Sequence, residues 1–404
     1  MSFQQGLSGL NAAAKNLDVI GNNISNSSTM GFKGSSTEFS DLFANSAVGG
    51  SSNSVGIGTT VGRIAQSFTQ GNIEVTSNPY DMAITGDGFF RMSKNGTISY
   101  TRNGQFGRDK DGYLVNSAGY NLTGFPASGG GTGISTSAPV NLQITDAPLA
   151  PNATTTAALR VGLVPSATIP TVTPFNPAVA DSYNASTPIA IYDSLGSQHT
   201  LSVFFAKTAP NTYSVYGALD GTSLGATPLG TMNFNTSGMM TTPPTINLNM
   251  AVGTGAANIT MNLDLTGSTQ YNTIFSTQAP AQDGYTTGQF TEVAMSPEGI
   301  ITASYSNGQT RNVGQVALST FINPGGLQTL GGNQWAETAA SGQPATAAPG
   351  SGNLGKLKSG ALEASNIDMT AELVDLITAQ RVYQANAQTI KAQDSVLQTL
   401  VNLR

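Results

Sequence analysis

The side chains that could do chemistry in this chain are few and widely spaced. There is no cysteine and only one histidine, so a thiolate site, a disulfide and a multi-histidine metal site are excluded. That histidine, His199, lies in a predicted strand between Gln198 and Thr200, and no second histidine completes a metal pair. We therefore expect it to be a structural or an exposed residue rather than a ligand.

Two other patterns resemble known binding motifs but lack some of the residues that those motifs require. Asp109 and Asp111 begin a stretch similar to a calcium loop, but the remaining spaced oxygen ligands and the closing glutamate are absent. Asp111-Gly112 between strands already indicates a hairpin turn. The glycine run from Gly56 to Gly62 fits neither Rossmann nor P-loop spacing and is interpreted as a mobile loop. We predict no enzyme, no catalytic residue, no cofactor and no metal; a glycosidase with paired carboxylates is the weakest alternative.

The composition excludes several classes of binding partner. Charged residues are 9% of the 404 residues, with a net charge of -6, whereas a typical soluble domain has about 25% charged residues. Nucleic acid is not expected because its phosphates need clustered lysine and arginine. No run of about 18 apolar residues predicts membrane insertion, and the first residues lack the basic and apolar regions of a secretory signal. We expect no small-molecule substrate and, if the protein is exported, a route without a cleaved signal peptide.

Apolar residues at alternating steps of four and three predict a helix at each end of the chain. The first pattern runs from Phe3 to Ile24, and the second runs from Met369 to Val401. The second is long enough for coiled-coil character and is interrupted at Gln380 and Asp394. These two residues either set the register or face solvent as the stripe drifts around the helix.

Between the ends the sequence indicates strands and turns. Residues 80–125 contain short β-prone runs separated by Asp-Gly and Asn-Gly pairs, which predict a β-meander. Residues 189–205 predict a hairpin, and residues 246–250 and 259–265 alternate apolar with polar side chains as half-buried strands do. The predicted fold class is therefore mainly β with helical ends, in a nested multi-domain chain whose terminal helices pair as a coiled-coil domain around two antiparallel β-rich domains.

Charge scarcity and flexible stretches suggest where the domains begin and end. Residues 121–280 hold very few charged side chains, and residues 341–360 are rich in Gly, Ala and Pro. The predicted division is a helical domain of 1–27 with 363–404, a linker region of 28–70 with 345–362, a first β-domain of 71–144 with 284–344, and an inserted outer β-domain of 145–283.

The two apolar stripes must be covered, because packing of that face supplies most of a helix's stability in water. They either meet each other in an intramolecular hairpin or zip against copies in other chains. The second arrangement joins different faces, and such a contact need not close and produces a helical filament. Both arrangements remain open at this point. The predicted assembly interface consists of Leu7, Leu10, Leu17, Ile20, Ile24, Leu373, Leu376, Tyr383, Ile390, Leu397 and Val401.

Several motifs at the two ends resemble the bacterial flagellar rod and hook axial protein family. They are SGLNAA at 8–13, LDVIGNNISN at 17–26, GFK at 31–33, DMAITGDGFF at 81–90, GALEASN at 360–366 and AQRVYQANAQTI at 379–390. The size and the long low-charge insertion make the chain similar to the hook branch of that family. A distal rod-type axial subunit is the alternative from the same family, and a secreted β-rich adhesin is the alternative from another class.

The resemblance implies a structural subunit of the bacterial flagellum, in the hook on the basal body. It implies a self-assembling tubular polymer that acts as a universal joint in motility and transmits torque from rod to filament. Implied partners are other copies of the chain, the rod, the hook cap, the hook-filament junction proteins and the flagellar type III export apparatus. The implied location is extracellular.

Overall fold

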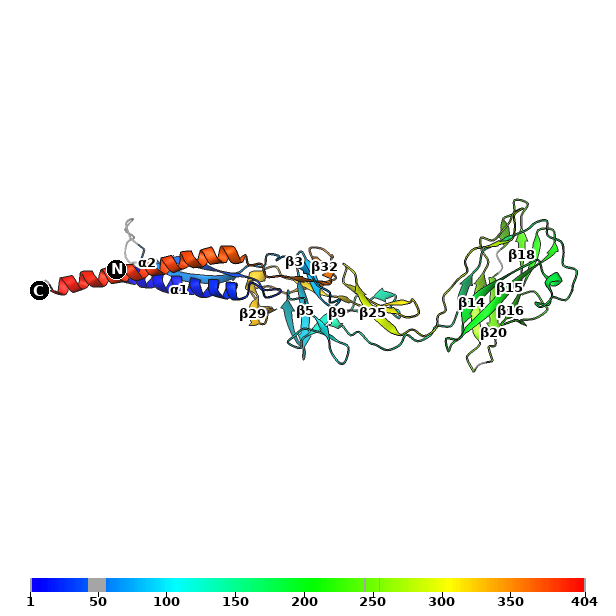
Figure 1. Ribbon diagram of the computed structural model, residues 1–404, viewed down its shortest axis with the longest axis horizontal. Helices are drawn as coiled ribbons and strands as arrows, with labels where there is room; N and C mark the ends of the chain where they lie inside the picture. Colours follow the sequence, from blue (N-terminus) through cyan, green and yellow to red (C-terminus); the bar gives the residue numbers. More distant parts are fainter. Residues whose placement is uncertain (1, 43–55, 243–244, 254, 403–404) are drawn as a thin grey trace. The chain divides into compact units, whose positions relative to one another are not determined.

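The computed structural model describes residues 2–42, 56–242, 245–253 and 255–402 (Figure 1). The chain divides into two compact units. Unit 1 contains residues 1–145, 292–304 and 310–404, and unit 2 contains residues 146–291 and 305–309. The Gly- and Ser-rich residues 49–52, whose composition predicts a flexible stretch, lie outside the described residues.

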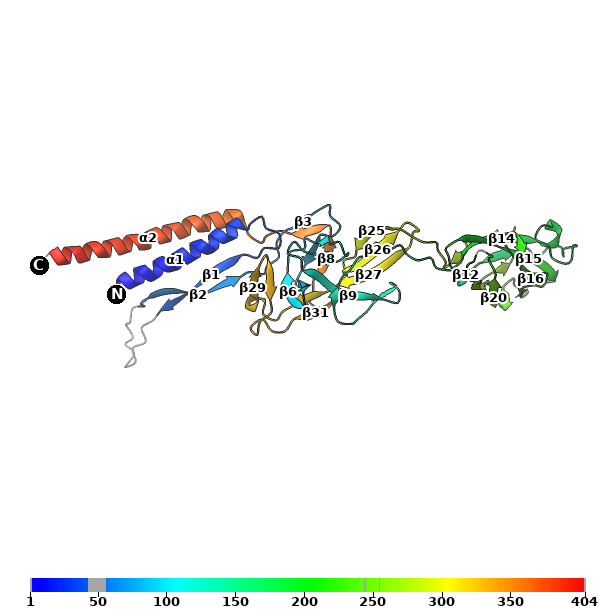
Figure 2. The same ribbon diagram turned by 90° about the horizontal axis from the view of Figure 1, so that it is seen from below.

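Unit 1 contains both long helices of the described chain, α1 (Ser2–Ser25) and α2 (Met369–Asn402). Their bounds agree with the predicted periodic stretches. The start of α2 is fixed by Asp368, whose Oδ1 accepts hydrogen bonds from the N–H groups of Thr370 at 2.8 Å and Ala371 at 3.2 Å. This side chain is an N-cap, which satisfies donors that the first helical turn leaves unpaired. Figure 2 shows the two helices side by side.

A β-hairpin follows α1 in the region expected to be a linker. Strand β1 (Ser35–Leu42) pairs antiparallel with β2 (Gly58–Gln66), and both strands contact α1. The interpretation of the glycine run from Gly56 to Gly62 as a mobile loop was wrong, because β2 begins at Gly58. Residues 37 and 39 share one face of β1 by the period of two that marks a strand, and Phe39 pairs with Val61.

The remainder of unit 1 is built on a large sheet. Its central order is β25-β26-β27-β9-β5-β6-β30-β29. The other strands of this sheet pair along its margins, and two short sheets, β3-β33 and β32-β4, join the segment after the hairpin to the segment before α2. The strands of this region are β3 (Ile73–Val75), β4 (Met82–Thr85), β5 (Phe89–Lys94), β6 (Thr97–Thr101), β7 (Gly107–Arg108), β8 (Leu114–Val115), β9 (Asn121–Ser128), β10 (Gly133–Ile134), β11 (Val140–Asn141), β25 (Phe290–Met295), β26 (Ile300–Tyr305), β27 (Thr310–Val316), β28 (Leu318–Thr320), β29 (Gln328–Gly331), β30 (Gln334–Ala336), β31 (Ala345–Ala347), β32 (Lys356–Ser359) and β33 (Ala361–Glu363).

The glycine pairs that predicted a meander have two different roles. Asn95-Gly96 joins β5 to β6, and both residues have positive φ, as a two-residue hairpin turn requires. Asp111-Gly112 joins β7 to β8, which confirms the hairpin turn preferred over a calcium loop. Asp87-Gly88 instead separates β4 and β5, which belong to different sheets. The hairpin interpretation was wrong there, because the dipeptide specifies a local turn and not which strands pair.

The region expected as a second linker, 345–362, also contains paired strands. β31 pairs with β28, and β32 pairs with β4. Its Gly and Ala residues allow close backbone approach rather than free movement: a Cβ on Gly355 would lie 2.5 Å from the carbonyl oxygen of Thr85. The composition of a flexible linker and that of a tightly packed edge segment are thus alike in this chain.

Unit 2 has its own apolar core, enclosed by three sheets. Their orders are β14-β15-β16-β18-β19, β20-β21-β12-β24 and β22-β13-β23. The predicted hairpin at 189–205 is β14-β15, and the alternating segments at 246–265 are the antiparallel pair β20-β21. The strands are β12 (Thr156–Ala158), β13 (Val161–Leu163), β14 (Ala185–Tyr192), β15 (Gln198–Ala209), β16 (Thr212–Leu219), β17 (Thr222–Ser223), β18 (Gly230–Phe234), β19 (Met240–Thr242), β20 (Thr245–Met250), β21 (Ile259–Asp264), β22 (Thr269–Gln270), β23 (Ser276–Thr277) and β24 (Ala281–Gln282).

Candidate assembly surface

The contact between α1 and α2 is antiparallel and uses small residues. A Cβ on Gly6 would lie 3.1 Å from Ile390, and a Cβ on Gly9 would lie 2.9 Å from the side-chain oxygen of Asn386. At the other end, the Asn23 amide donates to Glu372 Oε1 at 3.0 Å. Positions therefore rise along α1 as they fall along α2. Glycine on α1 lets the two backbones approach closely, so α1 contributes small residues where it meets Ile390 and Asn386 of α2.

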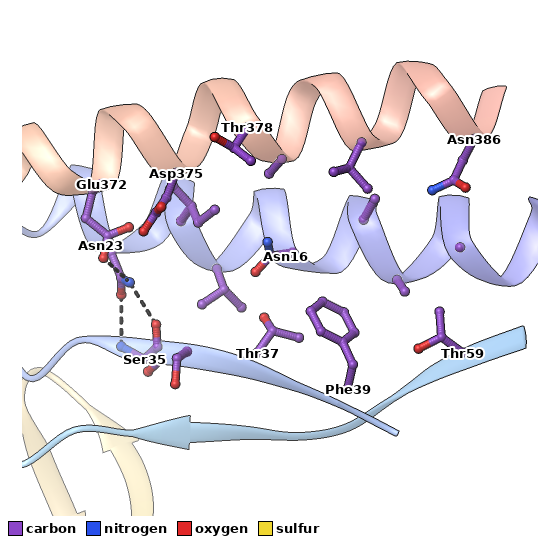
Figure 3. Close-up of a pocket in the computed structure, with 18 of the residues that line it drawn as sticks. Asn16, Asn23, Ser35, Thr37, Phe39, Thr59, Glu372, Asp375, Thr378 and Asn386 are labelled. Atoms are coloured by element: carbon purple, nitrogen blue, oxygen red, sulfur yellow. Dashed lines mark hydrogen bonds between the residues drawn. The ribbon is translucent and has the colours of Figure 1, made fainter. Parts of the chain in front are cut away.

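A groove of about 770 Å³ runs between the helix pair and the β1-β2 hairpin. Figure 3 shows α1 between α2 and the hairpin, with Phe39 directed from β1 toward α1. Ala12, Ala13 and Val19 line the groove on α1, and Ala379 and Val382 line it on α2. The charged lining residues, Glu372 and Asp375, are both acidic. The groove is therefore mainly apolar, with small side chains on both helices.

Except for Ile20, the predicted interface residues whose side chains are described do not line this groove. Ile20 is buried and lines the groove. Leu7 and Leu373 are each 45% exposed, and Leu397 is 56% exposed. The remaining residues with described side chains are partly buried, namely Leu10, Leu17, Ile24, Leu376, Tyr383 and Ile390. Val401 lies in the last turn of α2, and its side chain is outside the described part of the chain.

Helix geometry explains why the stripe of α1 is only partly covered within one chain. Successive residues lie about 100° apart around a helix, so Leu10 and Val19, nine positions apart, are on opposite sides. Val19 is buried beside the groove, whereas Leu10 is on the side that carries Leu7. The intrachain contact consequently leaves much of the large apolar surface of α1 accessible.

The end of α2 also has apolar surface that α1 does not cover. The antiparallel contact places Gly6 opposite Ile390. The first residue of α1, Ser2, therefore lies near residue 394 of α2, and the rest of α2 extends beyond α1. Val396 and Leu397 follow this point, and they are 61% and 56% exposed. Gln380 and Asp394, which interrupt the stripe, are exposed in the single chain, and Asp394 accepts a hydrogen bond from Gln398 at 3.0 Å.

A buried ion cluster fixes the helical ends to the β-rich part of unit 1. Glu363 accepts hydrogen bonds from Lys33 Nζ at 2.7 Å and from Arg102 Nη1 at 3.2 Å. The side chains of Lys33 and Glu363 are fully buried, and that of Arg102 is 3% exposed. Burial lowers the pKa of Lys33, and the nearby Glu363 carboxylate opposes this effect. Removing one partner of such a pair leaves an uncompensated buried charge, so loss of any of these three side chains is expected to be strongly destabilising.

Backbone contacts reinforce this junction between the first and last segments. The Gly31 N–H donates to the Glu363 carbonyl at 2.7 Å, and the Gly34 N–H donates to Asn366 Oδ1 at 2.8 Å. These residues belong to the GFK and GALEASN motifs or lie next to them. The motifs at the two ends therefore form a single structural unit, although the sequence separates them by most of its length.

Sequence reasoning missed three parts of this surface. The β1-β2 hairpin was overlooked in a stretch treated as linker, although Phe39 and its alternating neighbours gave a strand signal. The Asp368 cap was missed, although Asp directly before a periodic apolar run is a start signal. Arg102 gave no signal of its own, because only the fold brings it beside Lys33 and Glu363.

Among residues 2–42, 56–242, 245–253 and 255–402, no cluster of three or more His, Cys, Asp or Glu residues has the arrangement to hold a metal ion. Nor does any helix in the described part of the chain have the length and apolar character needed to cross a membrane.

Four family profiles match the chain, and together they cover both ends and the middle. They are described as flagella basal body rod protein (residues 3–33), flagellar hook protein FlgE/F/G D1 domain (83–164), flagellar basal body protein FlaE D2 domain (161–285) and flagellar basal body rod FlgEFG protein C-terminal (358–403). Two full-length relatives are the flagellar hook protein FlgE of Salmonella typhimurium, 43% identical over 410 residues, and that of Escherichia coli K12, 44% identical over 411 residues. Both alignments span 100% of this chain and 100% of the relative. The chain belongs to the flagellar hook protein family.

The fold agrees with this family. The crystal structure of Helicobacter pylori flagellar hook protein FlgE2 matches with a TM-score of 0.55 at 18% sequence identity, covering 72% of this chain and 100% of that one. As a hook-family member the chain is a structural subunit of the flagellar hook at the basal body, and it self-assembles. The recognition made from the terminal motifs is confirmed. The distal rod and adhesin alternatives are not favoured, because full-length relatives from several bacteria are hook proteins.

Proposed function

We propose that hook subunits join through the apolar stripes of α1 and α2, which the chain leaves exposed when it pairs these helices through Gly6 and Gly9. The intrachain pair and the contact between chains then use different faces of the same helices. On this proposal both alternatives left open by the spacing apply, because the helices meet each other and also meet copies. A contact between different faces repeats without closing, which suits a tubular polymer.

The observation that carries this proposal is that Leu7, Leu373 and Leu397 are exposed at positions spaced along one stripe of each helix. Burying each such side chain stabilises by about 1.5–3 kcal/mol relative to leaving it exposed. Repeated over several stripe positions in every subunit, this gain supports a stable polymer. The proposed interface keeps the residues predicted from sequence, including Leu10, Leu17, Ile24, Leu376, Tyr383 and Val401. Two predicted residues already make contacts within one chain, because Ile20 is buried beside the groove and Ile390 meets Gly6.

We further propose the mechanical role and the partners. The polymer acts as a universal joint that transmits torque from rod to filament, with the buried Lys33-Arg102-Glu363 cluster carrying load between the helices and the β-rich part of unit 1. The rod, the hook cap, the hook-filament junction proteins and the type III export apparatus are the proposed partners. The proposed location is extracellular, and no catalytic role is assigned. The four-part division predicted from sequence is retained, with the β1-β2 hairpin added to its segment 28–70.

Electron microscopy of purified chains tests the assembly mechanism. The full chain is expected to form tubes, and a chain lacking residues 1–24 and 365–404 is expected to remain monomeric with its β-rich parts folded. Retained β-type circular dichroism in the truncated chain is the control for folding. Tubes formed by the truncated chain would show that the terminal helices are not the assembly surface.

A further inference from the structure

The single histidine of the chain lies between two carboxylates in unit 2. His199 is on β15, Asp193 is in the turn that joins β14 to β15, and Asp220 directly follows β16. The ring Nδ1 is 2.6 Å from Asp220 Oδ2, and the ring Nε2 is 3.3 Å from Asp193 Oδ2. The imidazole and Asp193 are buried, whereas the Asp220 side chain is 51% exposed. The ring thus bridges a turn and the end of a neighbouring strand.

Backbone hydrogen bonds hold both carboxylates in position. Asp193 Oδ1 accepts from the N–H groups of Leu195 at 2.9 Å and Ser197 at 2.8 Å. Asp220 Oδ1 accepts from the Thr200 N–H at 2.8 Å. Each carboxylate therefore directs its other oxygen toward the ring. A carboxylate oxygen on both sides is satisfied only by an imidazolium, because a neutral imidazole has a single N–H to donate.

We propose that His199 is a pH-dependent clamp, which holds the β14-β15 turn against the end of β16 when its ring is protonated and releases one side when the ring becomes neutral. This clamp is a conformational switch within unit 2, and the proposed assembly through the helices does not depend on it. The charged groups bonded to the ring are Asp193 and Asp220, from the turn and from the strand end that pack against it. Both attract the protonated ring.

The titration of the three groups gives the direction of the effect. The hydrogen bond to Asp220 raises the pKa of His199 above its ordinary 6.5, burial opposes this rise, and Asp193 adds to it. For Asp193 and Asp220, burial acts to raise the pKa, but the backbone hydrogen bonds and His199 together lower it below 3.8. A raised histidine pKa stabilises the folded form fully below pH 6.5 and loses that contribution as the pH rises through the folded value.

The carboxylates set the acid limit of the same window. Their lowered pKa stabilises the folded form above pH 3.8 and loses that contribution as the pH falls through the lower folded values. The clamp is therefore complete between pH 3.8 and 6.5 and weakens on the alkaline side. The β14-β15 turn of unit 2 is expected to open more often at mildly alkaline pH than at mildly acidic pH.

Proton NMR of the full-length chain tests the clamp directly, since one histidine gives one ring signal. Titration of histidine-labelled protein is expected to give a midpoint above 6.5, and Asp220→Asn is expected to lower that midpoint. Asp264→Asn is the matched control: Asp264 also accepts side-chain and backbone hydrogen bonds in unit 2, from Thr266, and its loss leaves the midpoint unchanged. A wild-type midpoint at or below 6.5, or one insensitive to Asp220→Asn, overturns the clamp.

Amide hydrogen exchange provides a second readout on the same protein. After correction for intrinsic exchange rates, the peptide covering residues 193–201 is expected to lose protection between about pH 6 and about pH 8, the range in which histidine titrates. His199→Gln is expected to remove this pH dependence. Equal protection of the wild-type peptide at both pH values contradicts the proposal even if the His199→Gln chain fails to fold.

Discussion

The helical end of unit 1 and the core of unit 2 differ in where their large apolar residues lie, although unit 2 also exposes single residues such as Leu195 and Ile274. Unit 2 buries Ile191, Leu201 and Leu263 completely between its own sheets. The helices bury small residues such as Ala13 and Ala379 and leave Leu373 and Leu397 accessible. Unit 2 therefore completes its core within one chain, whereas the helices do not. Exposed apolar residues that repeat along one helix face are what the proposed contact with further chains would cover.

Each unit contains one residue of a type that occurs once in the chain, and this residue can report the unfolding of its unit. The only tryptophan, Trp335, is buried in unit 1, where Phe68 and Phe89 contact it edge-on. The only histidine, His199, is buried in unit 2. Trp335 fluorescence and the His199 ring signal therefore report the unfolding of one unit each in an unmodified chain.

The largest effect is expected from a charge placed on an exposed stripe. Leu397→Asp should abolish polymer formation, because an unpaired carboxylate would be buried between subunits. It should leave the single chain folded, since Leu397 is 56% exposed there. Sedimentation and electron microscopy measure assembly, and circular dichroism measures folding. Gln388→Asp, at another exposed position of α2, is the matched control and should still assemble. Tubes of normal length from Leu397→Asp would remove this stripe from the interface.

A smaller effect is expected at the buried ion cluster. Glu363→Gln removes the partner of Lys33 and Arg102 and should lower the free energy of unfolding of unit 1 by about 3–5 kcal/mol, the usual cost of breaking a buried pair. Urea unfolding followed by Trp335 fluorescence measures it. Glu38→Gln is the control, because the Glu38-Arg63 pair is exposed on the β1-β2 hairpin and should not move the midpoint. Equal responses of the two variants would contradict a specific role for the buried cluster.

The third effect tests whether the two units are independent. Leu263→Ala should lower the free energy of unfolding of unit 2 by about 2–5 kcal/mol, through lost contacts and a cavity in its core. The loss of the His199 signal should move to lower urea concentration, while the Trp335 transition and polymer formation stay unchanged. A parallel shift of the Trp335 transition would mean that the units unfold together, and the contrast drawn above would then fail.

Much of this fold could be predicted from the sequence, because several signals are local. The repeats from Phe3 and from Met369 gave both helices, and alternation gave β14-β15 and β20-β21. Which strands pair is not a local property. Asp87-Gly88 resembles a hairpin turn, yet its flanking strands join different sheets because β4 pairs with β32 and β5 pairs with β6.

The candidate surface was predictable only in part for a related reason. Apolar spacing identified Leu7 and Leu397 as interface candidates, but it did not show that Gly6 and Gly9 would form the intrachain contact. Large apolar residues produce the periodic signal from which a helix face is predicted, whereas the glycines between them contribute nothing to that signal. The groove and the Lys33-Arg102-Glu363 cluster depend on contacts between segments far apart in the chain, which periodicity does not report.

The bond between Lys33 and Glu363 spans 330 positions of the sequence, so it closes a loop that contains almost the whole chain. Loop closure over this distance has an entropic cost that grows only slowly with length, whereas a missing Glu363 leaves two cations without their shared anion. The buried pair can therefore form only in a chain that extends to residue 363. A subunit interrupted before that residue lacks both this pair and α2, while contacts such as the hydrogen bond from Asn333 Nδ2 to the Met30 carbonyl still hold the segment after α1 to the β-rich part of unit 1.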